Sequence, residues 1–256
     1  MTKYKYRKYS KYSIENPNVW AILQDRDAKS ETKILVKIIR KYRNFKSILD
    51  VGCGIGTHIY EYNKKGFKVK GTDADSAKIK FAKNRYPNLK FEIADMRNFK
   101  EKNRFDVITC IGSILVFNET NEEVMKTLNN FYNTLNKNGL LLIGLKNPLY
   151  LIEHCNFRKT FVDDQGDDRK KFGIKAVYEE GINCNRQTFI SKRTFYRLKD
   201  NKKVGIHKKE TRLFFPQELK FFIEQAGFEF VDYYAGISLK KDLNNSPNML
   251  IVCKKK

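Results

Sequence analysis

The sequence has few of the residues that build metal centres and disulfide frameworks. Among 256 residues there are three histidines and five cysteines. The cysteines stand at positions 53, 110, 155, 184 and 253, and no two of them have the CxxC spacing of a zinc or redox site. We therefore expect neither a disulfide-stabilised fold nor a bound metal.

Long apolar runs are also missing. Stretches such as residues 140–143 are far shorter than the roughly 20 apolar residues that cross a bilayer as a helix. The first thirty residues are rich in charge and tyrosine and contain no apolar segment typical of a secretory signal. These absences predict a soluble, cytoplasmic protein with no membrane partner.

Acidic residues are outnumbered, with 29 Asp and Glu against 51 Lys and Arg, for a net charge of +22. Such an excess can neutralise nucleic-acid phosphates. However, the excess is spread over the chain, is lightest per residue in 49–147, and consists mostly of lysine. Arginine is the preferred residue for bidentate phosphate and base contacts, so nucleic acid remains an alternative that is not favoured.

A strand–helix rhythm runs through the middle of the chain. Apolar strands are expected at 47–51, 67–72, 89–93, 105–111 and 140–145. Helices are expected between them at 57–65, 76–86 and 121–135, and the chain closes with a helix at 216–225 and strands at 228–234 and 249–253. This alternation predicts an α/β fold of the Rossmann-like kind, a seven-stranded, mostly parallel sheet with helices on both faces.

Two further segments flank this core. Residues 1–45 combine a basic, tyrosine-rich arm with apolar residues at helical spacing, which indicates a cover helix. After Pro148 the sequence turns to β-branched and aromatic residues with a hairpin turn at 199–202, which predicts an antiparallel β insert, or lid. The expected organisation is arm and cover helix (1–45), core (46–147), β insert (148–213), and last helix with closing strands (214–256).

The most specific pattern is a glycine loop, Ile-Leu-Asp-Val-Gly-Cys-Gly-Ile-Gly-Thr, at 48–57. The third glycine, Gly56, comes one residue too early for a dinucleotide fingerprint, and no Gly-Lys-Ser/Thr follows, which excludes a P-loop. Asp50 precedes the first glycine by two residues, where a carboxylate disfavours a pyrophosphate but suits a cationic amino group. The loop therefore favours a nucleoside with a zwitterionic tail.

Two more acids follow the next two strands. Asp73 lies 21 residues after Gly52, where an acid can accept hydrogen bonds from both ribose hydroxyls. Asp95 could accept from an adenine amino group, with Met96 packing on the ring. Singly, Asp50 or Asp95 would be interpreted as a helix cap or a solvated loop acid. Together they stand at carboxyl ends of successive parallel strands, where doubly wound sheets bind ligands.

With these motifs the chain resembles the class I S-adenosylmethionine-dependent methyltransferases over about residues 45–147. The resemblance implies S-adenosyl-L-methionine as cofactor and S-adenosyl-L-homocysteine as product. It implies that Asp50 and the glycine loop face the methionine portion, while residues 110–113 lie under the sulfonium and the acceptor. The implied cofactor-binding residues are Asp50, Gly52, Cys53, Gly54, Gly56, His58, Asp73, Ala74, Asp95, Met96, Cys110, Ile111 and Ser113.

The order of arm, core and β insert is similar to that of the amino-sugar and glycine-type small-molecule N-methyltransferases. Tyr12 matches the N-terminal tyrosine that abuts the cofactor in those enzymes. Phe117 stands where the amino-sugar enzymes place a histidine, so a base role for that position is not supported. After the fourth strand the chain has Cys-Ile-Gly-Ser rather than the [DNS]-P-P-[YFW] motif of DNA amino-methylating enzymes. Residues 147–150, Asn-Pro-Leu-Tyr, look similar to this motif but follow the fifth strand and lack the second proline. We interpret them as a turn at the exit of that strand.

Methyl transfer from a sulfonium depends mainly on proximity and orientation, and an amine acceptor must arrive deprotonated. Tyr12, Tyr150 and His154 are the candidate catalytic residues, with a structural role for His154 as the alternative. We expect a small-molecule amine acceptor, and an acidic or phosphorylated one is left open. The alternatives are methylation of RNA or protein with the basic arm as docking surface, and a non-catalytic cofactor- or RNA-binding module. The oligomeric state is also left open.

Overall fold

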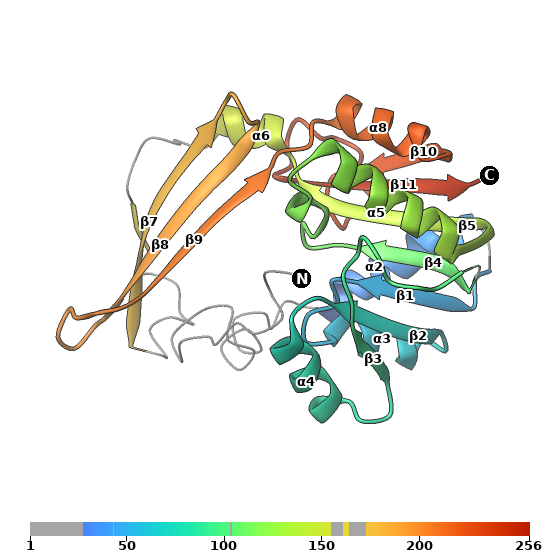
Figure 1. The fold of residues 1–256 in the computed structure, drawn as a ribbon, viewed down its shortest axis with the longest axis horizontal. Helices are drawn as coiled ribbons and strands as arrows, with labels where there is room; N and C mark the ends of the chain where they lie inside the picture. The colour runs from blue at the N-terminus through green and yellow to red at the C-terminus, as the bar shows by residue number, and fades with distance from the viewer. Residues whose placement is uncertain (1–27, 43, 103, 155–160, 164–172) are drawn as a thin grey trace.

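The computed structural model describes residues 28–42, 44–102, 104–154, 161–163 and 173–256. Two sheets organise these residues, and the smaller one extends away from the larger (Figure 1). The predicted N-terminal arm lies outside the described residues.

The larger sheet has seven strands, as predicted. Their order is β10 (Phe228–Tyr234), β11 (Asn248–Lys255), β5 (Leu135–Lys146), β4 (Phe105–Cys110), β1 (Ser47–Val51), β2 (Lys68–Asp73) and β3 (Lys90–Ile93). Strands β1 to β5 pair in parallel, whereas β11 is antiparallel to both β5 and β10. The sheet is therefore mostly parallel, with its reversed strand next to the edge.

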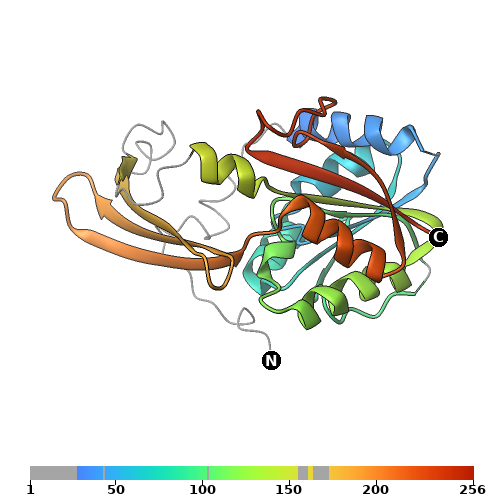
Figure 2. The same cartoon turned by 90° about the horizontal axis from the view of Figure 1, so that it is seen from above.

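Helices cover both faces of this sheet, also as predicted (Figure 2). One face carries α2 (Ala28–Arg40), α3 (Thr57–Lys64) and α4 (Ser76–Arg85). The other carries α5 (Asn121–Thr134) and α8 (Pro216–Gln225). Within the described residues, no helix is long and apolar enough to span a membrane.

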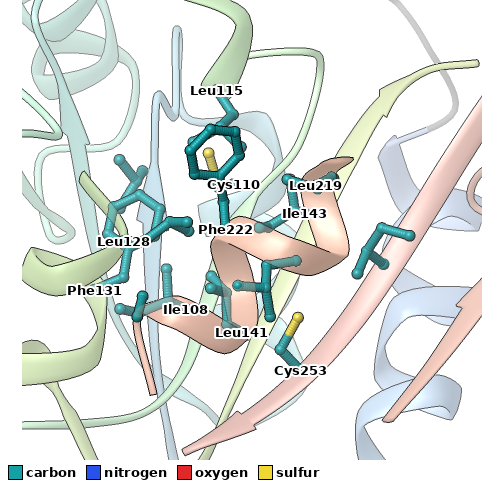
Figure 3. Close-up of a cluster of buried hydrophobic side chains, with 14 of the residues drawn as sticks. Ile108, Cys110, Leu115, Leu128, Phe131, Leu141, Ile143, Leu219, Phe222 and Cys253 are labelled. Atoms are coloured by element: carbon teal, nitrogen blue, oxygen red, sulfur yellow. The ribbon is translucent and has the colours of Figure 1, made fainter. Parts of the chain in front are cut away.

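Strand alternation divides the core into two layers. In β5, Leu140 and Leu142 pack toward α2, whereas Leu141 and Ile143 pack toward α5 and α8, because successive side chains of a strand point to opposite faces. The α5 and α8 layer is drawn in Figure 3, where Cys110 lies among the aliphatic and aromatic side chains. Both faces of the central strands are thus buried, as expected for a sheet covered by helices on each side.

The insert forms the second sheet. Its antiparallel strands are β6 (Phe161–Asp163), β7 (Ile174–Asn183), β8 (Thr188–Arg197) and β9 (Lys203–Arg212), in that order. The hairpin turn predicted at 199–202 is confirmed, and the amide of Arg197 donates to the carbonyl of Lys202 across it at 2.9 Å. The antiparallel sheet of the insert is therefore confirmed.

The expected turn at 147–150 is wrong, because Pro148 begins a helix, α6 (Pro148–His154). Proline fits the first turn of a helix, where its fixed φ is helical and no N–H is required. The amide of Leu151 donates to the carbonyl of Asn147 at 3.1 Å, which closes the first turn. The insert thus begins with a helix rather than with an extended exit from the sheet.

Two boundaries of the core also differ from expectation. Helix α5 ends at Thr134 and β5 starts at once with Leu135, five residues before the predicted strand. A short 3-10 helix, η1 (Leu115–Phe117), follows β4 and was not predicted. Neither difference changes the order or the direction of the strands in the larger sheet.

Candidate functional site

The topology places a crevice beside β1. From this strand the chain proceeds to β2 and β3 on one side, then crosses to β4 and β5 on the other. Ligands of doubly wound sheets bind outside the carboxyl ends of the strands at such a switch point. The predicted residues Asp50, Asp73 and Asp95 come from the ends of β1, β2 and β3 or just beyond them, so the fold brings them to this edge.

The glycine loop turns sharply from β1 into α3. The amides of Gly52 and Cys53 both donate to the carbonyl of Thr72, at 2.7 and 2.9 Å. Gly52, Gly54 and Gly56 have φ values of +74°, +56° and +82°, which L-residues with a side chain rarely adopt. A Cβ on Gly52 would also lie 2.5 Å from the side chain of Ile114. Both the backbone conformation and the close packing therefore require glycine.

Asp50 is a buried acid at the floor of this loop, 2% exposed. The hydroxyl of Thr109, on the adjacent strand β4, donates to Oδ1 of Asp50 at 2.7 Å. Among the described residues this is the one side-chain hydrogen bond that Asp50 accepts. Burial raises the pKa of Asp50 to about 6, although the charge of His58 and the hydrogen bond from Thr109 lower it. The loop thus covers a carboxylate that lacks a full counter-charge.

Asp73 ends β2 and organises the loop. Its Oδ2 accepts from the amide of Gly54 and its Oδ1 from the amide of Asp75, both at 2.9 Å. Burial raises its pKa, with the charge of Lys78 acting in the opposite direction. Each carboxylate oxygen keeps one lone pair, so Asp73 could still accept two ribose hydroxyls. The neighbouring Ala74 is half-buried beside it.

Asp95 differs because it already has a strong partner. Arg97 donates to it from the backbone amide (2.9 Å), Nε (2.8 Å) and Nη2 (2.7 Å). Burial opposes ionisation, but these hydrogen bonds and the charge of Arg97 outweigh it and lower the pKa of Asp95. One acceptor position remains on Oδ2, which is enough for a single amino group. Met96 is buried next to it, with Nδ2 of Asn118 3.7 Å from its sulfur.

The end of β4 lies beside β1 on the side away from β2. Cys110 is fully buried, and burial raises the pKa of its thiol well above the usual value, so it is a small core residue and not a thiolate nucleophile. Ile111 is buried too. Gly112 and Ser113 follow with φ values of +75° and +62°, and the amide of Ser113 donates to the carbonyl of Gly144. Cys53 in the glycine loop resembles Cys110, because burial raises the pKa of its thiol well above the ordinary value.

His58 connects the loop to the cover helix. Its Nε2 lies 2.9 Å from Oε2 of Glu31 on α2, and both side chains are largely buried. Since His58 also lies near enough to Asp50 to influence its pKa, the three residues form a cluster of ionisable side chains behind the glycine loop. The predicted contact of His58 with a cofactor stays a prediction.

The three candidate catalytic residues are not brought together. Tyr12 lies outside the described residues. Tyr150 and His154 are both on α6, where their rings stack at a centroid distance of 4.0 Å and Nδ1 of His154 lies 3.0 Å from the carbonyl oxygen of Tyr150. The side chain of His154 is 42% exposed. These contacts indicate a helix-stabilising pair, and a catalytic role for either residue stays a prediction.

Sequence reasoning did not single out Thr109, Glu31 or Arg97. A signal existed for Thr109, because it is a polar residue at the carboxyl end of β4, directly after the apolar pair Val107 and Ile108. Arg97 follows Asp95 by two residues, a spacing that could have indicated a local ion pair. Glu31 is distant in sequence from its partner His58, and only the packing of α2 on α3 joins them. No group of three or more potential metal ligands occurs among the described residues.

Comparison with known proteins agrees with this geometry. Residues 48–139 match the family described as a methyltransferase domain. The chain is 28% identical over 138 residues to dTDP-4-amino-2,3,4,6-tetradeoxy-D-glucose N,N-dimethyltransferase from Saccharopolyspora spinosa, covering 52% of this chain and 55% of that one. It is 31% identical over 145 residues to glycine/sarcosine N-methyltransferase from Halorhodospira halochloris, covering 53% of each. The chain thus spans about half the length of these curated relatives.

Solved structures extend the likeness over the whole fold. An amino pentose methyltransferase from Micromonospora echinaspora, solved with SAM bound, superposes with a TM-score of 0.75 at 18% identity, covering 98% of this chain and 100% of that one. A S-adenosylmethionine-dependent methyltransferase from Clostridium acetobutylicum gives 0.77 at 16% identity, covering 94% and 96%. The Rossmann-like fold with its β insert is therefore shared with methyltransferases.

Proposed function

We propose that this protein transfers a methyl group from S-adenosylmethionine to an amine nitrogen of a small molecule. The observation that carries the proposal is Asp50, a buried carboxylate at a glycine loop, with one hydroxyl as hydrogen-bond donor and a pKa raised to about 6 by burial. Such an acid suits a ligand with a cationic amino group. The methyltransferase-domain match over residues 48–139 supports the same assignment.

The remaining residues fit the rest of this cofactor. Asp73 would accept the two ribose hydroxyls on its unused lone pairs, and Asp95 would accept the adenine amino group on Oδ2, beside the buried Met96. When bound, S-adenosylmethionine supplies an electrophilic methyl group on a positively charged sulfur. The buried, protonated Cys110 beneath this position does not compete as a nucleophile.

A small-molecule amine is the preferred acceptor. Relatives named as amino-sugar N,N-dimethyltransferases and glycine/sarcosine N-methyltransferases support it. Because methyl transfer is an in-line displacement, the protein needs chiefly to orient the acceptor nitrogen and exclude water. The cytoplasmic location expected from the sequence belongs to the same proposal.

The experiment that tests the cofactor assignment is calorimetric titration of the protein with S-adenosylmethionine. We expect Asp73→Ala to weaken binding by about 10-fold or more, on the order of 1.4 kcal/mol. Asp106→Ala is a matched control, because Asp106 is also a half-buried acid that accepts backbone amides, but at the opposite end of the sheet. Equal affinity of wild type and Asp73→Ala would refute the ribose assignment.

A screen of methyl transfer over amines, amino sugars, small acids and RNA then tests the acceptor. Transfer to RNA alone, with steeply salt-dependent RNA binding that is lost on deleting residues 2–11, would replace the small-molecule proposal by the macromolecular one. Binding of the cofactor without transfer to any class would favour a non-catalytic module.

A further inference from the structure

A row of polar side chains crosses one face of the insert sheet in register. Tyr178 of β7 pairs with Arg193 of β8, and Arg193 pairs with His207 of β9. Directly paired residues of antiparallel strands project from the same face, so these three side chains stand side by side. Ala176 and Phe195, a pair on this same face, are buried.

The adjacent row reaches the core. Ser191 pairs with Glu180 on one side and with Lys209 on the other. Nζ of Lys209 lies 4.7 Å from the ring centroid of Phe117, in the short helix η1 that follows β4. This contact identifies the face, which we call the inner face, as the one turned toward the end of β4. The inner face therefore borders the crevice described above on its acceptor side.

Arg193 is the unusual member of the inner face. Its Nε is buried and makes no hydrogen bond, and no carboxylate in the described part of the chain forms an ion pair with its guanidinium. Its recorded contact is with the ring of Tyr178, 5.0 Å from the centroid. Glu180, an acid on this face, accepts from the hydroxyl of Ser191 at 3.2 Å.

The opposite face of the insert sheet, which we call the outer face, carries a cation of the same strand that has an acidic partner. Lys192, the residue before Arg193, points to the opposite face and pairs with Glu179 at 2.7 Å. Leaving a buried donor of a charged group without an acceptor is costly, so such groups are expected to have a partner. A guanidinium donor that is buried without an acceptor is best complemented by an anion, because charge-assisted hydrogen bonds are the strongest it can make.

We infer that the inner face binds an anionic group of the methyl acceptor, a phosphate or a carboxylate, through Arg193 with Lys209 beside it. The guanidinium fork matches both oxyanions in bidentate geometry, and the ammonium of Lys209 adds a point charge closer to the crevice. The inference rests on the proposed function for the identity of the ligand as an acceptor. Under this inference the crevice binds the cofactor, and the insert binds the anionic group of the acceptor.

The test is calorimetric titration of the full chain with pyrophosphate, inorganic phosphate and succinate at constant ionic strength. We expect at least one probe to bind, and Arg193→Gln and Lys209→Gln each to weaken it by about 10-fold, whereas Arg193→Lys weakens it less. Lys208→Gln is the matched control, because it removes the same charge from the next residue on the exposed outer face. Stronger binding of the phosphates or of succinate identifies the oxyanion.

Two results would overturn the inference. One is that no probe binds the wild-type protein, and the other is that Lys208→Gln weakens binding as much as Lys209→Gln, since surface charge alone would then explain it. Titration with S-adenosylmethionine and thermal unfolding of each variant show that the crevice and the fold are intact. Because anion binding is measured without methyl transfer, an anion site in a protein that binds no cofactor would refute the proposed function alone.

Discussion

The crevice and the insert each hold a charge that the described fold leaves incompletely satisfied, and the two charges have opposite signs. In the crevice it is the carboxylate of Asp50, which has one hydroxyl donor and a raised pKa. On the insert it is the guanidinium of Arg193, whose Nε is buried without an acceptor. The crevice therefore suits a cation and the insert an anion, so under our two proposals charge alone separates the cofactor from the acceptor.

The largest expected effect is on the crevice. Asp50→Asn keeps the size of the side chain but removes its charge, so we expect S-adenosylmethionine to bind about 100-fold more weakly, or roughly 2.7 kcal/mol. Calorimetric titration measures this loss. Probe anions should bind the variant as they bind wild type, and an equal loss of both ligands would contradict the separation of the two regions.

The same substitution should stabilise the unliganded protein at neutral pH. The native state binds the Asp50 proton more tightly than the unfolded state, since its pKa is raised from 3.8 to about 6. The free energy of unfolding therefore falls as pH rises through this interval, by about 3 kcal/mol for this group. Between pH 4 and pH 7, the free energy of unfolding of Asp50→Asn relative to wild type should therefore rise by about 3 kcal/mol, which denaturant unfolding at both pH values measures. A difference that does not change with pH would refute the raised pKa.

A smaller effect is expected on the free energy of unfolding when each of two arginines is replaced. Arg97 holds the buried Asp95 with three hydrogen bonds, so Arg97→Met should cost about 2 kcal/mol of unfolding free energy by leaving that carboxylate unpaired. Arg193→Met should change stability by only about 0.5 kcal/mol, because its lost ring contact is offset by removing a buried, unsatisfied donor. Chemical denaturation of both variants measures the contrast. Similar losses would mean that Arg193 has a structural partner.

The two regions also differ in how far the sequence predicts them. The crevice follows from local patterns: β1 runs from Ser47 to Val51 as expected, and the glycines of the loop take the positive φ values that their spacing indicates. The hydrogen bond from Thr109 to Asp50 was not predicted, because it depends on the register of two strands 59 positions apart.

On the insert, a run of β-branched and aromatic residues and one turn predicted antiparallel strands, and the structure has them. The alignment of Arg193 between Tyr178 and His207 depends on the register of two hairpins, which no short motif encodes. The helix α6 was not predicted, because Pro148 fits both the first turn of a helix and a turn at the end of a strand.

The insert sheet is a single continuous segment of the chain between β5 and α8, and it has a small core of its own around Ala176, Tyr178 and Phe195. Changes on its inner face therefore need not disturb the strands that form the crevice. Under the proposals above, substitutions in β7, β8 and β9 would change acceptor preference while the glycine loop and its three acids stay as they are.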